Sequence, residues 1–304
     1  MIVHHLNCVS SCPLGGCLMD GVTKGLSIRG RLACHCLLIE TEAGLVLCDT
    51  GFGLRDVHHP RDRLSAFFLA MVSPDLREEM TARRQIEQLG FKAHDVRHIV
   101  LTHLDFDHAG GLDDFPNATV HMLALERDAA ASQKTWLDRQ RFRPQQWSSS
   151  DRWKVYYADE GEHWMGLECT QQLQGLPPEI ALVPLTGHTH GHAGIGVKTQ
   201  DKWLLHAGDA YFYKDEMNAR PYCTPGLRMY QWMMDKNRHD RIGNQKRLRM
   251  LSAAHRNQLD VFCSHDVTEF ERLAGRALHF PAQRALVTQE PSCISPARNR
   301  PLQD

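Results

Sequence analysis

Short runs of hydrophobic residues, separated by polar turns, recur along the chain and predict β-strands in preference to long helices. The first fifty residues contain three such runs, and Glu42-Ala43-Gly44 makes a plausible hairpin turn between the second and the third. Most later runs end at Gly, Asp or His. The predicted strands are residues 1–6, 32–41, 45–48, 99–101 (with 94–100 leading into it), 118–123, 179–185, 194–198, 202–206 and 259–263.

Helical periodicity is confined to a few segments. Residues 74–89 begin with Pro74-Asp75, offer an apolar face and stop at Gly90, which predicts one helix. Residues 124–134 and 244–257 are also helix-like. The polar segment 55–63, with His58 and His59, is predicted as an exposed loop in which neither histidine has a partner.

We predict one domain over residues 1–290, with an aromatic-rich insertion at about 130–176 and a flexible tail at 291–304. Trp, Tyr and Phe mix with Arg and Gln in the insertion without a clear period. Such a segment could be a lid or pocket wall, because binding residues concentrate on loops over a rigid scaffold. It could equally be a peripheral helical subdomain or a dimer contact.

Composition limits the partners. The chain has 304 residues, 42% of them hydrophobic and 23% charged, which is enough for a full core. Its formal net charge of -1 gives no global field for nucleic acid or an anionic membrane, so we expect neither as a partner. A small-molecule substrate is expected, and a homodimer is left open. The lack of an apolar run of about 20 residues and of a basic-apolar leader favours the cytoplasm.

Ten cysteines occur, and in the cytoplasm we expect them to be reduced. Five of them could in principle form a structural zinc site, although their spacing matches no close C-x2-C pair. Buried or idle thiols are the preferred interpretation. The five are Cys8, Cys12, Cys17, Cys34 and Cys36.

A dense group of metal-ligand side chains follows the short strand at 99–101, in the stretch I-V-L-T-H-L-D-F-D-H-A-G-G-L at 99–112. His103, Asp105, Asp107 and His108 fall within six positions. At alternate positions of an extended or turned segment these side chains can converge on one side. Any one of them alone could simply cap a helix, as Asp105 or Asp107 could for a helix near His108.

The same stretch resembles the H-x-[H/E/D]-x-D-H core of the metallo-β-lactamase superfamily, and T-H-L-D-F-D-H-A-G-G is most similar to N-acyl-homoserine lactonases. Other landmarks of that family follow in order over roughly residues 30–275. They are L-V-L-C-D-T-G at 45–51, T-G-H-T-H-G-H at 186–192, H-A-G-D-A at 206–210 and C-S-H-D at 263–266.

This resemblance implies an α+β fold, the four-layer αβ/βα sandwich, with the metals at the strand ends on one edge. It implies two divalent ions, one held by His103, Asp105 and His188 and the other by Asp107, His108 and His265. Asp209 would bridge them, since a carboxylate can hold two cations. Asp49 is expected to support the ligand loop. His192 is expected to pack or hydrogen-bond nearby, and His190 to be exposed.

Two such ions would hold a bridging hydroxide that attacks a carbonyl, with Asp107 or a metal-bound water passing a proton to the leaving group. Most hydrolases of this superfamily carry His where this chain has Asp105, and diiron redox members carry a carboxylate there. A carboxylate shifts the preference toward iron or manganese. We place zinc first, with manganese or iron as alternatives.

The leading functional hypothesis is a dinuclear metal-dependent hydrolase of a small ester or lactone, similar to quorum-quenching lactonases. Phosphoesters, thioesters or β-lactams are alternative substrates for the same site. A diiron redox protein, or a binding protein with little turnover, is an alternative function. Related lactonases place a tyrosine three residues after the bridging Asp. This chain has Phe212 there, and we expect Tyr211, Phe212 and Tyr213 to contact substrate.

Overall fold

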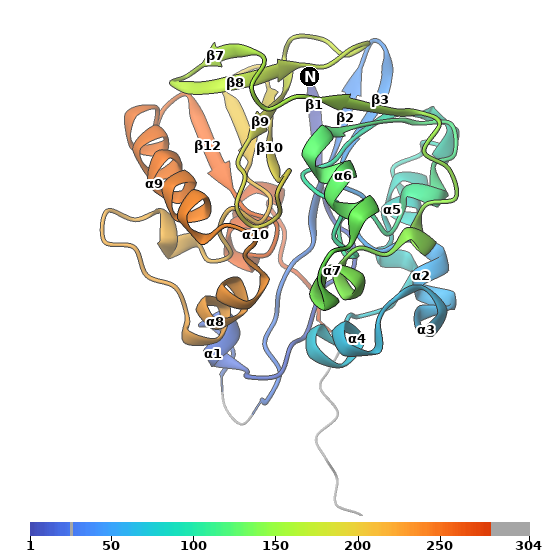
Figure 1. Cartoon of the computed structure of the whole chain (residues 1–304), viewed down its shortest axis with the longest axis vertical. Helices are drawn as coiled ribbons and strands as arrows, with labels where there is room; N and C mark the ends of the chain where they lie inside the picture. The colour runs from blue at the N-terminus through green and yellow to red at the C-terminus, as the bar shows by residue number, and fades with distance from the viewer. Residues whose placement is uncertain (25–26, 281–304) are drawn as a thin grey trace, which may run out of the picture.

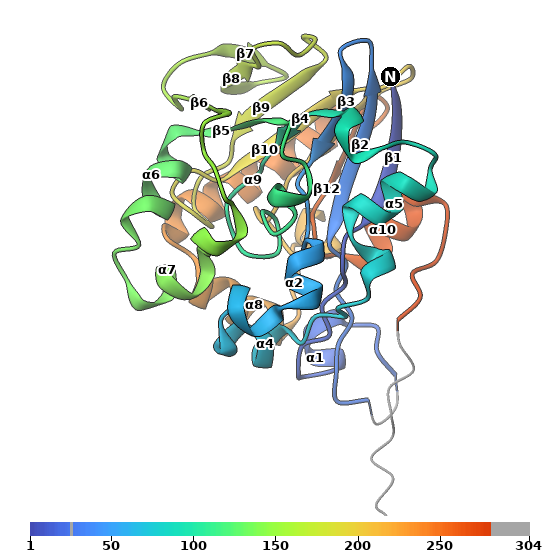
Figure 2. The same ribbon diagram turned by 90° about the vertical axis from the view of Figure 1, so that its right-hand side faces the viewer.

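Two six-stranded β-sheets lie back to back, with helices on both outer faces (Figures 1 and 2). The computed structural model describes residues 1–24 and 27–280, and for 168–170 the backbone alone. The four-layer sandwich expected from the motifs is confirmed. The predicted flexible tail at 291–304 lies outside the described residues. No helix in the described part of the chain combines the length and the apolar character needed to cross a membrane.

The first sheet has the order β1-β2-β3-β4-β5-β6. β1, β2 and β3 pair antiparallel, whereas β3 to β6 pair parallel. Its strands are β1 (Ile2–Asn7), β2 (His35–Thr41), β3 (Gly44–Cys48), β4 (Val96–Val100), β5 (Thr119–Leu123) and β6 (Trp153–Tyr156).

The second sheet has the order β12-β11-β10-β9-β8-β7, and within it only the β11–β12 pair is parallel. Its strands are β7 (Glu162–Trp164), β8 (Leu167–Gln172), β9 (Ile180–Pro184), β10 (Ala193–Lys198), β11 (Trp203–His206) and β12 (Leu259–Phe262).

The helices are short apart from α9. They are α1 (Cys17–Asp20), α2 (Leu54–His58), α3 (Pro60–Arg63), α4 (Ala66–Val72), α5 (Ala82–Gln88), α6 (Ala124–Ser132), α7 (Trp136–Arg141), α8 (Pro225–Met234), α9 (Arg238–Ala254) and α10 (Val267–Ala274). Short 3-10 turns complete them: η1 (Glu78–Met80), η2 (Ala93–Asp95), η3 (Leu112–Asp114), η4 (Pro144–Gln146) and η5 (Lys214–Met217).

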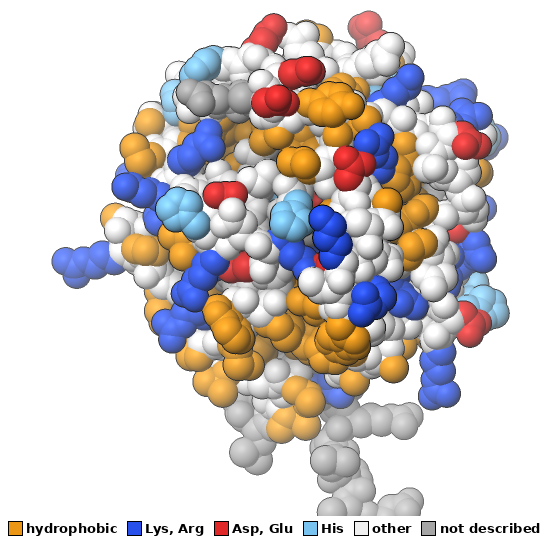
Figure 3. All heavy atoms as spheres, viewed as in Figure 1, with side chains coloured by type: hydrophobic (Ala, Val, Ile, Leu, Met, Phe, Trp, Pro, Cys, Tyr) orange, Lys and Arg blue, Asp and Glu red, His pale blue; other side chains and the backbone are white. Residues whose placement is uncertain are grey.

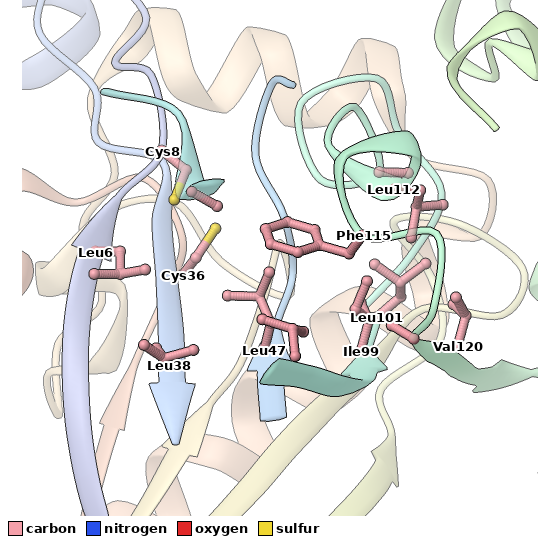
Figure 4. Packing of buried hydrophobic residues seen from close by; sticks show 14 of the residues in the cluster. Leu6, Cys8, Cys36, Leu38, Leu47, Ile99, Leu101, Leu112, Phe115 and Val120 are labelled. Atoms are coloured by element: carbon pink, nitrogen blue, oxygen red, sulfur yellow. The ribbon is translucent and has the colours of Figure 1, made fainter. Parts of the chain in front are cut away.

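The core follows from the alternation of side chains along the strands. Leu37 and Ile39 of β2 point between the sheets, where they join residues such as Ile195 of β10. Cys36 and Leu38 point to the outer face, where Ile86 of α5 belongs to the same cluster (Figure 4). Because successive strand residues face opposite sides, an apolar strand fills both layers at once.

Two local predictions are wrong. Residues 55–63 form α2 and α3 instead of a loop, and His58 contacts Glu78 (Nε2 to Oε2, 2.7 Å). The helix predicted at 74–89 begins only at α5, because Thr81 caps it by accepting a hydrogen bond from the Arg84 amide. Upstream, the Asp75 amide donates to the Ser10 carbonyl at 2.8 Å, which holds that segment against the N-terminal loop.

The aromatic-rich segment 130–176 contributes to both sheets. It contains the end of α6, then α7, then β6 at the edge of the first sheet, and finally β7 and β8 at the edge of the second. α7 lies beside α6 on the outside of the molecule (Figure 1). The segment therefore closes the sandwich along one side and places α7 next to the ligand loop.

The carboxyl ends of five strands meet at one edge of the sandwich. β3 and β4 are parallel in the first sheet, and the pairings of the second sheet make β9, β11 and β12 run in one direction. The loops after these strands lie together at that edge. In Figures 1 and 2, α1, α4 and α8 gather at the end of the molecule opposite β7 and β8.

Candidate metal centre

Seven buried side chains from four separate segments converge at this edge. Four come from the loop after β4, and the others follow β9, β11 and β12. None of them is more than 7% exposed. The structure thus brings together every ligand named from the sequence: His103, Asp105, Asp107, His108, His188, Asp209 and His265.

One set of donors is spaced as a single metal ion requires. The Oδ1 atom of Asp209 lies 3.4 Å from His108 Nε2 and 3.2 Å from His265 Nε2. His265 Nε2 lies 3.8 Å from Asp107 Oδ2. Tetrahedral ligands at bonds of about 2.1 Å are about 3.4 Å apart, so these atoms fit one ion. We call Asp107, His108, His265 and Asp209 the inner set.

Unsatisfied polar atoms support a cation at the inner set. His108 Nε2 and Asp209 Oδ1 are buried and have no hydrogen-bond partner among the described residues, and His103 Nε2, a neighbour outside the inner set, is unpaired in the same way. Leaving such atoms without a partner is costly in a folded protein. A divalent ion would satisfy the two atoms of the inner set, and the donor set therefore fits a metal.

The second set, His103, Asp105 and His188, is called the outer set. Its donors are equally close: His103 Nε2 and His188 Nε2 lie 3.4 and 3.1 Å from Asp105 Oδ2. Burial, and then His108, lower the pKa of His103 to about 4, so its ring is neutral at pH 7. A neutral imidazole is the form that binds metal.

Arg141, the last residue of α7, contacts the outer set. It was not identified from the sequence as a residue of the site. Its side chain is fully buried, and it donates from Nε to Asp105 Oδ1 at 2.6 Å and from Nη2 to Asp105 Oδ2 at 2.5 Å. Burial by itself raises the pKa of Asp105, but this guanidinium and His103 hold it well below its usual range. The only sign of such a partner in the sequence was Asp105, because a buried carboxylate needs a positively charged group beside it.

Asp49 supports the ligand loop, as predicted. Its Oδ1 accepts from the Thr102 amide at 2.7 Å, and its Oδ2 accepts from His108 Nδ1 at 2.8 Å. This fixes the His108 ring with Nε2 toward the inner set. Asp49 has a backbone φ of 54°, a conformation that few non-glycine residues adopt.

We expect Asp49→Ala to weaken zinc binding by about 10–100-fold, because His108 loses the partner that orients it. The measurement is competition for zinc against a chromogenic chelator. Glu42→Ala, in the exposed turn before the same strand, is the control and should bind zinc like the wild type. Equal affinity in the Asp49 and Glu42 variants would remove the supporting role.

The turn after β9 is held by two buried side chains, His192 of the turn itself and Glu126 of α6. His192 donates from Nδ1 to the Leu185 carbonyl at 2.9 Å and accepts at Nε2 from the Asp209 amide at 2.8 Å. His192 therefore hydrogen-bonds beside the site, and His190 is exposed, both as predicted.

Glu126 of α6 is buried and joins two ligand loops. It accepts from the Leu104 amide at 2.8 Å, the Thr189 hydroxyl at 2.5 Å and the Gly191 amide at 3.1 Å. A Cβ on Gly191 would come within 2.1 Å of the Glu126 nitrogen, so this close approach needs glycine. The role of Glu126 could not be predicted from the sequence, because the residue lies in an ordinary helical segment.

An apolar cavity of about 200 Å³ opens directly beside the inner set. Asp107 and His265 line it together with Phe212 and with residues of α1, α4 and α8. In Figure 3, hydrophobic side chains gather on the lower part of the visible face, the part over α8 and α4. The apolar walls are Leu14, Met19, Leu32, Met71, Val72, Met229, Tyr230 and Met233.

Of the three aromatic residues expected to contact substrate, only Phe212 lines this cavity, where it stacks on His265 at a centroid distance of 5.1 Å. Tyr211 is buried elsewhere and donates to Glu269 (2.9 Å to Oε1), and Tyr213 packs near Gly21. Tyr230 is the phenol that the cavity offers instead. Burial, and then the carboxylates of Asp107, Asp105 and Asp209, raise the pKa of Tyr230 well above its usual value.

The cysteines do not form a metal site within the described residues. Cys8, Cys34 and Cys36 lie in or beside the outer-face core, and Cys34 donates to the Asp107 carbonyl at 3.1 Å. No candidate metal-binding group in the described part of the chain includes a cysteine. Of the five cysteines considered, Cys8, Cys34 and Cys36 are buried, Cys12 is partly buried and Cys17 is exposed.

Comparisons with known proteins give consistent results. The family model described as "Metallo-beta-lactamase superfamily" matches residues 29–249. A Mycobacterium tuberculosis protein described as "Probable metallo-hydrolase" is 38% identical over 264 residues, 87% of this chain and 80% of that protein. An N-acyl homoserine lactonase of Bacillus cereus is 26% identical over 197 residues, 64% of this chain and 71% of its own.

Solved structures show the same fold at low identity. A variant of the B. thuringiensis protein AiiA, with N-decanoyl-L-homoserine bound at its active site, matches with a TM-score of 0.66 and 19% identity. The match covers 89% of this chain and 95% of that one.

Proposed function

The chain belongs to the metallo-beta-lactamase superfamily of hydrolases, as its motifs predicted, and we propose that it cleaves small esters or lactones with an apolar acyl group. The observation that carries this proposal is the apolar cavity that ends on Asp107 and His265 of the inner set. An apolar chain bound there would leave its carbonyl group at the metal centre. A lactonase among the relatives and an acyl-homoserine bound in a structural neighbour support the same substrate class.

The side chains of the site supply three functions in this reaction: metal binding, proton transfer and a hydrogen bond to the substrate. Asp107, His108, His265 and Asp209 would hold a divalent ion, which supplies water activation and carbonyl polarisation when bound. Asp107 lines the cavity and is placed to accept a proton from the attacking water and return it to the leaving oxygen. Tyr230 remains protonated and donates a hydrogen bond to the substrate, the task that Phe212 cannot perform.

Zinc is the proposed metal, because two imidazoles and two carboxylates suit it. The sequence argument for iron relied on Asp105 as a ligand, and Arg141 binds both oxygens of that carboxylate. A diiron redox function therefore loses its main support. The predicted cytoplasmic location and homodimer remain predictions.

Phosphoesters are a poorer match than carbonyl esters. None of the described residues that line the cavity is Lys or Arg, whereas sites for phosphate usually supply such charges. Uncharged acyl compounds therefore remain the proposed class.

We expect kcat/KM for a series of unbranched acyl esters to rise about two- to fourfold per added methylene until the cavity is full, since each buried methylene contributes up to about 0.8 kcal/mol. The zinc-loaded chain is assayed with acetyl to decanoyl esters and the matching lactones. Met229→Glu, at the exposed rim, should abolish the rise while leaving acetyl ester turnover unchanged. A flat series in the wild type, or no turnover of any ester or lactone, would contradict the proposed substrate class.

A further inference from the structure

Arg141 occupies the part of the centre where a second cation was expected. Its guanidinium binds both oxygens of Asp105 and, through Nη2, also lies 2.9 Å from His188 Nε2. Guanidinium and carboxylate meet here in the two-pronged geometry that both groups favour. Two of the three side chains of the outer set are thereby engaged.

His188 cannot serve Arg141 and a metal ion at once. A guanidinium N–H can only donate, so at 2.9 Å from Arg141 Nη2 the His188 Nε2 atom is the acceptor and uses its one lone pair. The Asp105 Oδ2 atom lies 3.1 Å from the same nitrogen and then receives no proton from it. With Asp105 and His188 engaged, the outer set keeps only His103 Nε2 and a shared oxygen of Asp209. Two donors are too few, because protein zinc sites use three or four.

The guanidinium is held in place from several sides. Arg141 is 0% exposed, and its Nη1 donates to the Met234 carbonyl at 2.7 Å, at the end of α8. A weaker contact joins Nη1 to the His188 carbonyl at 3.4 Å. With all three nitrogens bonded inside the protein, the side chain is a fixed part of the centre.

Charge leads to the same conclusion. Asp105 gives the outer set one negative charge of its own, and Arg141, bound to both of its oxygens, cancels that charge. A dication added to the outer set would lie next to the guanidinium with no further carboxylate except the shared Asp209. Like charges in a buried site strongly repel each other.

We propose that this chain holds a single divalent ion, at the inner set, and that Arg141 takes the place of the second. The guanidinium then orients Asp105 and His188 and neutralises the charge of the Asp105 carboxylate. This inference rests on the proposed function, because it describes the same centre. It replaces the two-ion centre that the sequence predicted.

Metal content tests the inference directly. The wild-type chain is stripped with a chelator, reloaded with excess zinc, desalted and analysed by mass spectrometry of the metal. We expect one zinc per chain. Anomalous diffraction from crystals of the same material should place that zinc between Asp107, His108, His265 and Asp209.

A double variant, Asp105→His with Arg141→Met, restores a neutral ligand and removes the cation. We expect it to retain two zinc ions per chain. Arg139→Met, an exposed arginine on the same helix, is the matched control and should retain one. If the double variant does not fold, the wild-type count and the position of its ion decide.

The possible outcomes separate the two proposals. Two ions in the wild type, or one ion in a folded double variant, would contradict the proposal that Arg141 replaces the second ion. The proposed hydrolase function would not be affected by either result. One ion in the wild type and two in the double variant would support it. One ion bound in the wild type without turnover of any ester or lactone would instead contradict the proposed function, whereas the proposal of one metal ion per chain would still hold.

Discussion

Asp209→Ala is expected to reduce ester hydrolysis by at least about 1,000-fold, equivalent to about 4 kcal/mol of transition-state stabilisation. Asp209 Oδ1 lies closest to both histidines of the inner set, at 3.2 and 3.4 Å. Burial alone raises the pKa of Asp209, but His265 and His108 hold it well below its usual range, so it is ionised and ready to bind a cation. The measurement is kcat/KM at saturating zinc. His108→Ala should behave in the same way.

The fold should survive the Asp209 change, because this side chain stands at a strand end outside the hydrophobic clusters. Circular dichroism and thermal unfolding check this. Asp201→Ala, in the exposed turn between β10 and β11, is the control and should keep full activity. A folded Asp209 variant with wild-type turnover would remove the catalytic centre described above.

Glu126→Ala is expected to lower the free energy of unfolding by about 2–6 kcal/mol. Two buried amides, those of Leu104 and Gly191, lose their acceptor, and each unsatisfied group costs about 1–3 kcal/mol. Urea unfolding measures the change. Asp128→Ala, exposed on the same helix, should change stability by less than about 0.5 kcal/mol. Equal stability in the two variants would show that Glu126 does not hold the loops.

The cost of Glu126→Ala should depend on pH. Burial raises the pKa of Glu126 to about 7 in the folded chain, above its ordinary value of about 4.5. As pH rises between these values, the unfolded chain loses this proton while the folded chain keeps it, so the contribution of Glu126 falls by up to about 3 kcal/mol and levels off above pH 7. The variant should therefore be more destabilised at pH 5 than at pH 7.5. A larger cost at pH 7.5 would contradict the raised pKa.

The centre illustrates which contacts local sequence encodes. His103, Asp105, Asp107 and His108 could be proposed as ligands because they are close in sequence and follow an apolar strand. The turn chemistry of His188, Asp209 and His265 could be matched by resemblance. The bond from Arg141 to Asp105 spans 36 positions, and no pattern around Arg141 distinguishes it from its neighbours Arg139 and Arg143.

The failures at residues 55–63 and 74–89 have a related cause. The sequence pattern predicted a polar loop at 55–63 and a helix at 74–89. The start of α5, however, depends on the Thr81 cap and on the contact of Asp75 with Ser10. α4, with two phenylalanines, was not predicted either, and it packs with Phe52 and Phe106 in one cluster. Such elements are short, so tertiary contacts outweigh their own propensity.

By itself, the sequence determined the family, the type of metal ligand and most strands, because alternation and clustered donors are local properties of the chain; β6, β7 and β8, in the segment without a clear period, were not predicted. Tertiary structure decided which charges meet. Only packing brings α7 under the ligand loop, places Glu126 between two turns and sets Tyr230 in the cavity wall. The partner of a buried charge is set by distances in the folded molecule, and our proposal for the number of metal ions depends on that pairing.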